Sequence, residues 1–257
     1  LLTQDLAGLL TVEKLADHLS ELADIVLDLT LPLCWRRIKI RHRAEPKFSV
    51  ISYGKLGGKE LGYASDLDIV FLFDDDAPEA AEVYTRLAQR TNTWLSSQTA
   101  AGQLFDTDLR LRPNGDSGPL VCSITSLENY LITQGREWER YAWIKARIMN
   151  TGDNLQPEWN AQLERIARPF IFRKYLDFGA INAMRDLHAQ IRREVARKDM
   201  AHNVKLGPGG IREIEFLAQV FQLIRGGRDT SLQIKPTLRV LDRLAERGII
   251  TREAEQQ

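Results

Sequence analysis

The spacing of hydrophobic residues changes along the chain from helical to extended and back to helical. Between residues 11 and 29 apolar side chains recur every three or four positions, which predicts an amphipathic helix that Pro32 ends or bends. Two short apolar stretches, 48–53 and 69–73, are typical of strands, and a helix is expected over 79–98. Helical spacing also covers most of the second half, over 125–135, 138–148, 157–168, 180–198, 211–224 and 237–247. We therefore expect an α+β fold, in which a small sheet with its helices is followed by a helical bundle.

These patterns divide the chain into three parts. We expect a helical segment over 1–45, a domain that contains the sheet over 46–155, and a helical domain over 156–257 that is truncated at its C-terminal end. The chain begins with Leu1 rather than Met and stops inside a helical pattern. We therefore expect it to be a piece of a longer protein.

Composition narrows the class of protein. The 257 residues are 44% hydrophobic and 27% charged, which is ordinary for a globular protein, and Lys+Arg equals Asp+Glu at 35 each. The balanced charge gives no indication of binding to nucleic acid or to a membrane surface. Two cysteines, and the lack of any run of ~20 apolar residues, are consistent with a cytoplasmic protein without disulfides or a transmembrane helix.

The most informative stretch lies between the first two predicted strands. Gly54, Gly57 and Gly58 predict a turn in which backbone N–H groups approach an anion closely, because glycine has no Cβ and tolerates positive φ. Asp66 and Asp68 follow at the start of the second strand, where alternation places both side chains on one face. Two such carboxylates repel each other unless they share a cation, and Mg²⁺ is usually held by carboxylates together with substrate phosphates. This order of motifs indicates phosphoryl or nucleotidyl transfer.

Residues 103–112 predict a third strand with charges of both signs on one face. Asp106, Asp108, Arg110 and Arg112 alternate there with apolar or neutral residues. If this strand lies beside the strand that carries the first two aspartates, Asp108 adds a third carboxylate, and the arginines can bind phosphate oxygens bidentately. An edge strand with a ladder of Asp–Arg pairs explains the same pattern equally well.

Three carboxylates on one sheet face suit catalysis by two cations about 4 Å apart, which together stabilise the attacking and leaving oxygens. The expected ligands of Mg²⁺, with Mn²⁺ as an alternative, are Asp66, Asp68 and Asp108. The expected phosphate and nucleotide contacts are Gly54, Lys55, Gly57, Gly58, Ser65, Arg110 and Arg112. For Ser65, capping of the turn is an equally good interpretation.

Other polar groups carry a weaker signal. Asp74–Asp76 end the second strand and are interpreted as a solvated turn. The basic stretch 35–43 is interpreted as an exposed face, with contact to an acidic partner as the alternative. Gly54–Gly58 matches neither the Walker phosphate loop nor the dinucleotide-binding glycine pattern. A zinc site or a Ser-His-Asp triad is not expected, because the histidines lack ligand spacing: His18, His42, His188 and His202.

The glycine and aspartate motifs resemble those of a known superfamily. Gly54-Lys55, then Asp66-Leu67-Asp68 after ten residues and a later Asp108, is similar to the DNA-polymerase-β-like nucleotidyltransferases, although Lys55 stands where serine is usual. A closer resemblance, to the bifunctional glutamine synthetase adenylyltransferase/adenylyl-removing enzymes, covers about residues 48–245. The motifs that carry it are GKLGGKEL at 54–61, SDLD at 65–68, LRLRP at 109–113 and KLGPGGIREIEF at 205–216.

The resemblance has several implications. It implies a polymerase-β-like domain with a small mixed sheet, Asp66, Asp68 and Asp108 as metal-binding carboxylates, and a helical domain from about residue 170 like that of the PII uridylyltransferases. The family joins two related domains: the amino-terminal one removes AMP from a glutamine synthetase tyrosine by phosphorolysis, giving ADP, and the carboxy-terminal one attaches AMP from ATP. Residues 112–121 and 134–143 resemble the amino-terminal half. The partners implied are adenylylated glutamine synthetase, the PII signalling protein, phosphate and ADP.

Two alternatives to the adenylyl-removing half stay open. The chain could instead be the adenylyl-transferring half, or a regulatory module that binds PII or glutamine without catalysis. Transfer of nucleotides to RNA or a small molecule is disfavoured by the neutral charge. Glu213 and Glu215 fit a helix start that the helix dipole favours, with a place in the active-site cleft as the alternative.

Overall fold

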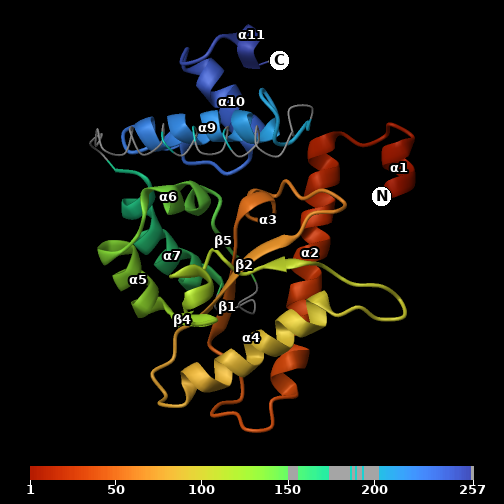
Figure 1. The fold of residues 1–257 in the computed structure, drawn as a ribbon, viewed down its shortest axis with the longest axis vertical. Helices are drawn as coiled ribbons and strands as arrows, with labels where there is room; N and C mark the ends of the chain where they lie inside the picture. The colour runs from red at the N-terminus through yellow and green to blue at the C-terminus, as the bar shows by residue number, and fades with distance from the viewer. Residues whose placement is uncertain (150–155, 174–185, 187–188, 190–192, 194–202, 256–257) are drawn as a thin grey trace. The chain divides into compact units, whose positions relative to one another are not determined.

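The computed structural model describes residues 1–149, 156–173, 186, 189, 193 and 203–255, and the chain forms two compact units (Figure 1). The first unit comprises Leu1–Gln134 and Lys145–Ile166, and the second Gly135–Ile144 and Ala167–Gln257. The elements of the first are α1 (Leu2–Leu6), α2 (Val12–Arg36), β1 (Phe48–Ser52), α3 (Gly54–Gly58), β2 (Leu67–Phe73), α4 (Ala80–Ser96), β3 (Thr107–Asp108), η1 (Gly115–Ser117), β4 (Val121–Ser123), α5 (Ile124–Thr133), β5 (Arg147–Met149) and most of α7 (Gln156–Ile171).

Among the described residues of the first unit, five strands form one mixed sheet. Its order is β3-β2-β1-β5, and β4 also pairs with β2. β1 is antiparallel to both β2 and β5, whereas β3 and β4 are parallel to β2 and meet it at its two ends. The expected α+β class with a small mixed sheet is confirmed.

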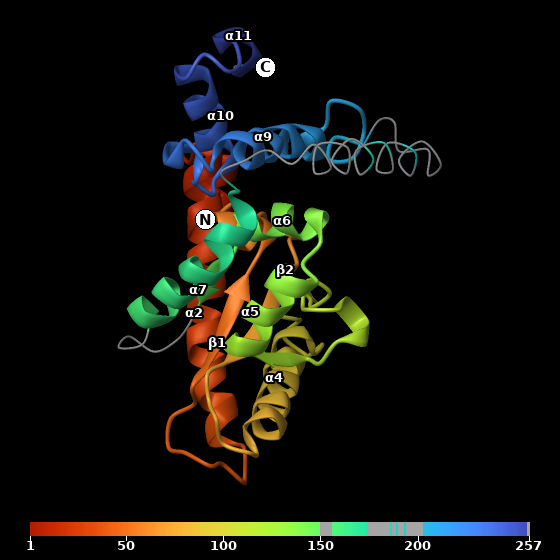
Figure 2. The same ribbon diagram turned by 90° about the vertical axis from the view of Figure 1, so that its left-hand side faces the viewer.

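The two faces of β2 have different surroundings. The side chains of Leu67, Ile69, Phe71 and Phe73 are buried in one apolar core together with residues of α2 and α4. Figures 1 and 2 show these two helices beside the strands. Because side chains alternate along a strand, Asp68 belongs to the opposite face. The core thus holds β2 firmly and leaves the carboxylate on the face away from α2 and α4.

Helix α2 differs from its prediction in length and in the face that it buries. It begins at Thr11, whose hydroxyl accepts a hydrogen bond from the Lys14 amide, and continues through Pro32 to Arg36. Three of the apolar positions expected to be buried, Leu22, Ile25 and Leu29, are exposed. The buried set recurs about every four residues, which places it along the side of α2 that contacts α4: Leu19, Ala23, Leu27, Leu31, Cys34 and Trp35.

Two predictions near the end of the first unit are wrong. The predicted helix over 138–148 ends at Ile144, and Arg147–Met149 forms β5 instead. Pairing with β1 decides this, because the short strand gains backbone partners that the isolated segment lacks. Thr125 and Glu128 have the spacing of a capping box, which predicts that a helix starts at Thr125. Instead, helix α5 is capped by Ser123, which accepts a hydrogen bond from the Ser126 amide.

The expected solvated turn at 74–76 is wrong for Asp75. Its side chain is only 3% exposed, and one carboxylate oxygen lies 2.7 Å from both His42 Nε2 and the Tyr84 hydroxyl. Arg43 completes an ion pair, and the Ala77 amide donates to the other oxygen. This cluster ties the end of the basic stretch to the loop after β2, at the opposite end of the strand from Asp66 and Asp68.

The second unit is helical in its described part, with α6 (Glu137–Ile144), the end of α7, α9 (Ile211–Arg225), η2 (Thr230–Leu232), α10 (Thr237–Glu246) and α11 (Arg252–Glu255). The Arg140 guanidinium donates to the carbonyl of Ile171, and Tyr141 stacks on Phe216 with ring centroids 5.1 Å apart. Helices α9 and α10 appear where expected. The predicted helix over 180–198, with His188, lies almost entirely outside the described residues, and His202 lies outside them. No helix of the described chain has the length and apolar character that a bilayer span requires.

Candidate functional site

The parallel pairing of β2 with β3 brings the three predicted aspartates together. Asp68 is the register partner of Asp108, and the amide of Leu67 donates to the carbonyl of Asp106 at 2.8 Å. One carboxylate oxygen from each of Asp66, Asp68 and Asp108 lies within 4.8 Å of the others. Asp66 is exposed and the other two are partly buried, so the cluster opens to solvent.

The strand that carries Asp108 is shorter than predicted. Only Thr107–Asp108 pair with β2, whereas the sequence predicts a strand over 103–112. Asp108 itself ends the strand, because its carboxylate accepts the backbone N–H of Arg110 at 2.9 Å and thereby turns the chain. The alternation of Asp and Arg therefore reflects a turn, and the prediction that Arg110 and Arg112 share a strand face with Asp108 is wrong.

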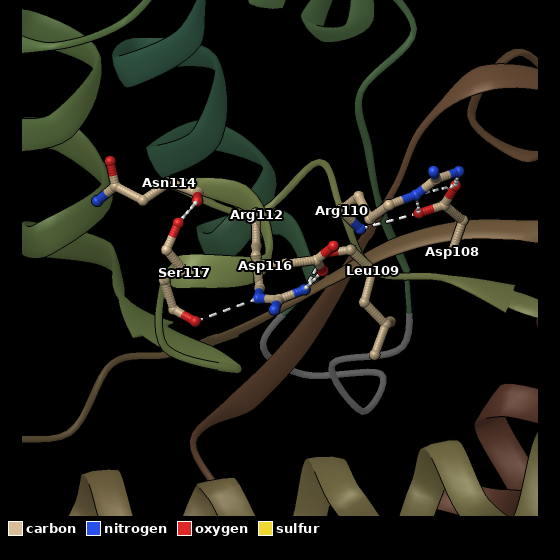
Figure 3. A network of polar contacts seen from close by, with 8 residues as sticks. Asp108, Leu109, Arg110, Arg112, Asn114, Asp116 and Ser117 are labelled. Atoms are coloured by element: carbon tan, nitrogen blue, oxygen red, sulfur yellow. Dashed lines mark hydrogen bonds and ion pairs between the residues drawn. The ribbon is translucent and has the colours of Figure 1, made fainter.

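Arg112 lies within the following loop (Figure 3). Its guanidinium donates to the carbonyl of Leu109 at 2.8 Å and forms an ion pair with Asp116 at 3.4 Å. Its side chain is only 12% exposed. These contacts hold the loop that contains η1, and the phosphate contact expected of Arg112 stays a prediction.

Gly54 fits closely against Asp68. The Tyr53 amide donates to the Asp68 carbonyl at 2.8 Å, which continues the β1–β2 pairing to the start of α3. At Gly54 φ is +51°, and a Cβ built there would lie 2.4 Å from Asp68 Oδ2. Only glycine allows both this backbone conformation and this approach to the carboxylate.

The other two glycines pack against protein atoms. Residues 54–58 form a short helix, and the Gly57 amide donates to the Tyr53 carbonyl at 2.9 Å. The phosphate contact expected at Gly57 and Gly58 stays a prediction. A Cβ on Gly57 would lie 2.0 Å from the Lys145 carbonyl oxygen, and one on Gly58 would lie 2.6 Å from Glu60 Oε2. Gly57 therefore allows α3 to approach the segment that leads into β5, and Gly58 leaves room for the Glu60 side chain.

Two ion pairs that support α3 were missed in the sequence. Lys145 pairs with Glu60, and the Lys145 side chain is 5% exposed. Arg147 forms a bidentate pair with Asp24 at 2.9 and 3.0 Å and also donates to the Leu56 carbonyl. The signal that identifies them is the alternation of charged and apolar residues over 145–148, which is typical of a strand and not of the helix we predicted.

The structure also shows where three other residues singled out in the sequence lie. Ser65 accepts a hydrogen bond from the Gly62 amide at 3.1 Å, which agrees with the interpretation of a turn cap. Lys55 lies in α3 and is partly buried. Glu213 accepts the Gly209 amide at 2.9 Å at the start of α9, which agrees with the helix-start interpretation.

Arg110, which contacts the carboxylate cluster, changes the pKa of one of its members. Arg110 contacts Asp108 through its backbone amide, through Nε at 3.0 Å to each carboxylate oxygen, and through a terminal guanidinium nitrogen. These hydrogen bonds lower the pKa of Asp108 below its usual range, against the opposing effect of burial. Asp108 is therefore held in the charged form that a cation requires.

The donor set fits a divalent cation. Three carboxylates are hard oxygen ligands, and two oxygens on opposite sides of one Mg²⁺ lie about 4.2 Å apart. One oxygen from each of the three carboxylates lies within 4.8 Å of the others, a spacing that is compatible with one shared cation or with two cations about 4 Å apart. The cluster is thus compatible with Mg²⁺ or Mn²⁺, and its role as a metal site stays a prediction.

Comparisons with known proteins agree with this chemistry. Residues 1–165 match the family model for glutamate-ammonia ligase adenylyltransferase, and residues 185–257 match that for GlnD PII-uridylyltransferase. The chain is 52% identical to a bifunctional glutamine synthetase adenylyltransferase/adenylyl-removing enzyme of Aromatoleum aromaticum, over 97% of this chain and 28% of that protein. Proteins of the same name from Chromobacterium violaceum and Neisseria meningitidis are each 49% identical, over 95% and 83% of this chain and 28% and 24% of those proteins.

The chain thus spans less than a third of the length of these relatives. The match to the first family model nevertheless covers more than half of the chain, including the whole β-sheet and its three carboxylates. By these matches, the chain belongs to the glutamate-ammonia ligase adenylyltransferase family.

Proposed function

We propose that this chain is the phosphorolytic deadenylylating part of a bifunctional glutamine synthetase adenylyltransferase/adenylyl-removing enzyme. The observation that carries the proposal is the convergence of Asp66, Asp68 and Asp108, each with one oxygen within 4.8 Å of the others, on a sheet of the expected mixed type. The names of the relatives support glutamine synthetase as the substrate. The choice of the adenylyl-removing half depends on the motifs at 112–121 and 134–143.

The reaction transfers an adenylyl group between two oxygen atoms. An oxygen of inorganic phosphate attacks the α-phosphorus of the adenylyl-tyrosine, and a P–O bond forms that gives ADP. The bond between phosphorus and the tyrosine oxygen breaks, and the tyrosinate takes a proton from solvent. A divalent cation, when bound, neutralises the charge that builds up on the phosphoryl oxygens.

The residues of this chain position that reaction. Asp66, Asp68 and Asp108 would hold the cation, and the parallel pairing of β2 and β3 keeps the carboxylates of Asp68 and Asp108 side by side. Gly54 keeps the start of α3 close to Asp68. Lys55, partly buried in α3, is the proposed phosphate contact on that side of the site.

The rest of the chain belongs to the proposal at the level of domains and partners. We propose residues 46–155 as the catalytic domain and 156–257 as a helical domain. The match of 185–257 to the GlnD PII-uridylyltransferase model supports the PII signalling protein as a partner of the parent polypeptide. Regulation by PII or glutamine would act through that region.

The proposal is tested by offering the chain both candidate substrates. With adenylylated glutamine synthetase, phosphate and Mg²⁺, we expect ADP to form; with unmodified enzyme and ATP, we expect no adenylylation. Asp66→Asn and Asp68→Asn should each abolish ADP formation without loss of fold, as judged by circular dichroism. Asp106→Asn is the matched control, because that exposed side chain, two residues before Asp108, accepts from Gln103 and is not part of the carboxylate cluster.

The outcomes separate the alternatives. Adenylylation from ATP in place of ADP formation would assign the chain to the other half of the reaction. No turnover with either substrate, and PII binding that is unaffected by the aspartate substitutions, would indicate a regulatory module. ADP formation that survives in both Asp66→Asn and Asp68→Asn would contradict the proposed site.

A further inference from the structure

Arg110 is hydrogen-bonded to Asp108, one of the carboxylates that the cation would need as a ligand. Its backbone N–H and its Nε donate to Asp108 Oδ1 at 2.9 and 3.0 Å, and Nε and a terminal nitrogen contact Oδ2, so both oxygens of Asp108 are engaged (Figure 3). A cation shared by Asp108 with Asp68, its register partner, has to take one of these oxygens. The guanidinium and the cation therefore compete for the same ligand.

The two kinds of contact made by Arg110 differ in how easily they can be broken. The backbone N–H is fixed by the turn that ends β3, and it orients Asp108 whatever the side chain at position 110 is. The guanidinium belongs to a side chain that is 72% exposed, while the side chain of Asp108 is 16% exposed. The Arg110 guanidinium can return to solvent at little cost, and a cation that binds Asp108 would replace its positive charge beside that carboxylate.

The side chain of Arg112, unlike that of Arg110, is held inside the protein. Its side chain is 12% exposed, and its guanidinium is bonded to the carbonyl of Leu109 and paired with Asp116 inside the loop. Breaking those contacts would leave a largely buried charge without partners, which is far more costly. Of the two arginines after Asp108, only Arg110 has the exposure that a moving group requires.

We propose that Arg110 is an exchangeable counter-ion: it pairs with Asp108 in the cation-free protein and turns to the oxygens of inorganic phosphate once a divalent cation takes that carboxylate. The proposal rests on the proposed function and adds an order of events to it. Repulsion between the guanidinium and the cation drives the exchange. Phosphate is the ligand for the released group, because a guanidinium binds phosphate oxygens bidentately and the released arm starts beside the cation.

The first test measures cation binding without turnover. Mn²⁺ alone is titrated calorimetrically into the wild type, Arg110→Gln and Arg86→Gln. Loss of the competing guanidinium should make Mn²⁺ binding about two- to fivefold tighter in Arg110→Gln, the range set by exposed ion pairs. Arg86→Gln changes the net charge equally, but Arg86 is an exposed residue of α4 that pairs with Glu82, so its affinity should equal that of the wild type. Equal or weaker binding by Arg110→Gln would overturn the proposal.

The second test separates the exchange from a purely repulsive effect. In deadenylylation assays, Arg110→Gln should raise the KM for phosphate about tenfold or more, and Arg110→Lys should restore part of the loss, since lysine keeps the charge without the bidentate geometry. A KM for phosphate that is unchanged in Arg110→Gln would overturn the phosphate step.

Failure of this inference is distinguishable from failure of the proposed function. If Asp68→Asn abolishes Mn²⁺ binding and ADP formation while Arg110→Gln changes neither Mn²⁺ affinity nor the KM for phosphate, only the exchange is wrong. If the wild type forms no ADP at all, the proposed function fails, and the Mn²⁺ titrations still decide whether Arg110 competes with a cation.

Discussion

Gly54 is the residue on which the geometry of the carboxylate cluster depends most closely. It combines a positive φ with a contact so close that a single methyl group would reach Asp68 Oδ2. The sequence motif predicts that Gly54 contacts an anion, whereas in the structure its conformational freedom serves to place α3 against a carboxylate. The same residue was thus identified for a different physical reason.

Gly54→Ala should weaken Mn²⁺ binding at least about tenfold and destabilise the protein by about 1–3 kcal/mol, because alanine strains the positive φ and displaces the Asp68 carboxylate. Calorimetric titration and urea unfolding measure the two effects. Gly62→Ala, in the loop between α3 and β2, is the control, because a Cβ there meets Ser65 Oγ at an ordinary 3.4 Å. Its stability should change by less than about 0.5 kcal/mol, and similar losses in both variants would contradict the role assigned to Gly54.

Asp75 shows what hydrophobic patterns cannot reveal at this scale. Three successive aspartates after a strand have the composition of a turn, and nothing local distinguishes the middle one. Its burial depends on His42 and Tyr84, which lie 33 and 9 residues away in the sequence. Burial alone would raise the pKa of Asp75, but hydrogen bonds from His42, Tyr84 and the Ala77 amide, with the charge of Arg43, hold it at about 2.

A defined pH dependence follows. Because the pKa of Asp75 in the folded state, about 2, lies below the ~3.9 of an unfolded aspartate, its contribution to stability is complete above about pH 4. That contribution is lost as the pH falls from about 4 to 2. Asp75→Asn should cost about 2–4 kcal/mol at pH 7 and flatten the fall in unfolding free energy over that window, as measured by urea titration at several pH values. The exposed Asp76→Asn should leave both unchanged, and an unaltered acid profile in Asp75→Asn would contradict the assignment.

Among the elements, the long helices and the two longest strands could be predicted, and the short strands could not. β1 and β2 are rich in apolar residues, and all of their side chains except that of Asp68 are buried, so their pattern carries the information locally. β3 and β5 contain two and three residues, and they exist because β2 and β1 offer them backbone partners. Asp108 then ends β3 with its own side chain, so an alternating pattern over ten residues gives a strand of two.

The start of α5 offers a test at this scale. Ser123 accepts the Ser126 amide and caps the helix, whereas Thr125, the predicted cap, is exposed within the first turn. Ser123→Ala should therefore cost about 1 kcal/mol of unfolding free energy, and Thr125→Ala less than about 0.5 kcal/mol. Thermal or urea unfolding followed by circular dichroism distinguishes them, and the reverse order would favour the capping box of the sequence prediction.

For the molecule as a whole, motif spacing predicted the carboxylate cluster more fully than it predicted the contacts that support it. Asp66, Asp68 and Asp108 are brought together as the predicted adjacent strands required. The ion pairs that support α3 join Lys145 to Glu60 and Arg147 to Asp24, residues that are 85 or more positions apart in the sequence. No local sequence pattern predicts such pairs. Local chemistry is thus readable from spacing, whereas long-range support depends on the fold.

Cation binding should stabilise the unit that contains the sheet. A ligand that binds the folded state at ten times its dissociation constant adds about 1.4 kcal/mol, which corresponds to about 3–6 °C in Tm for a unit of this size. Mn²⁺ should therefore raise the Tm of the wild type, and the increase should disappear in Asp68→Asn but persist in Asp106→Asn. An equal increase in all three proteins would indicate that the cation binds elsewhere.

A crystal structure of the Mn²⁺-soaked protein, with anomalous data collected at the manganese edge, would show whether the three aspartates form a metal site. We expect an anomalous peak with carboxylate oxygens of Asp66, Asp68 and Asp108 at about 2.0–2.6 Å, and the guanidinium of Arg110 turned away from Asp108. A fully soaked crystal with no peak between these three side chains, or with its peaks at other carboxylates, would contradict it.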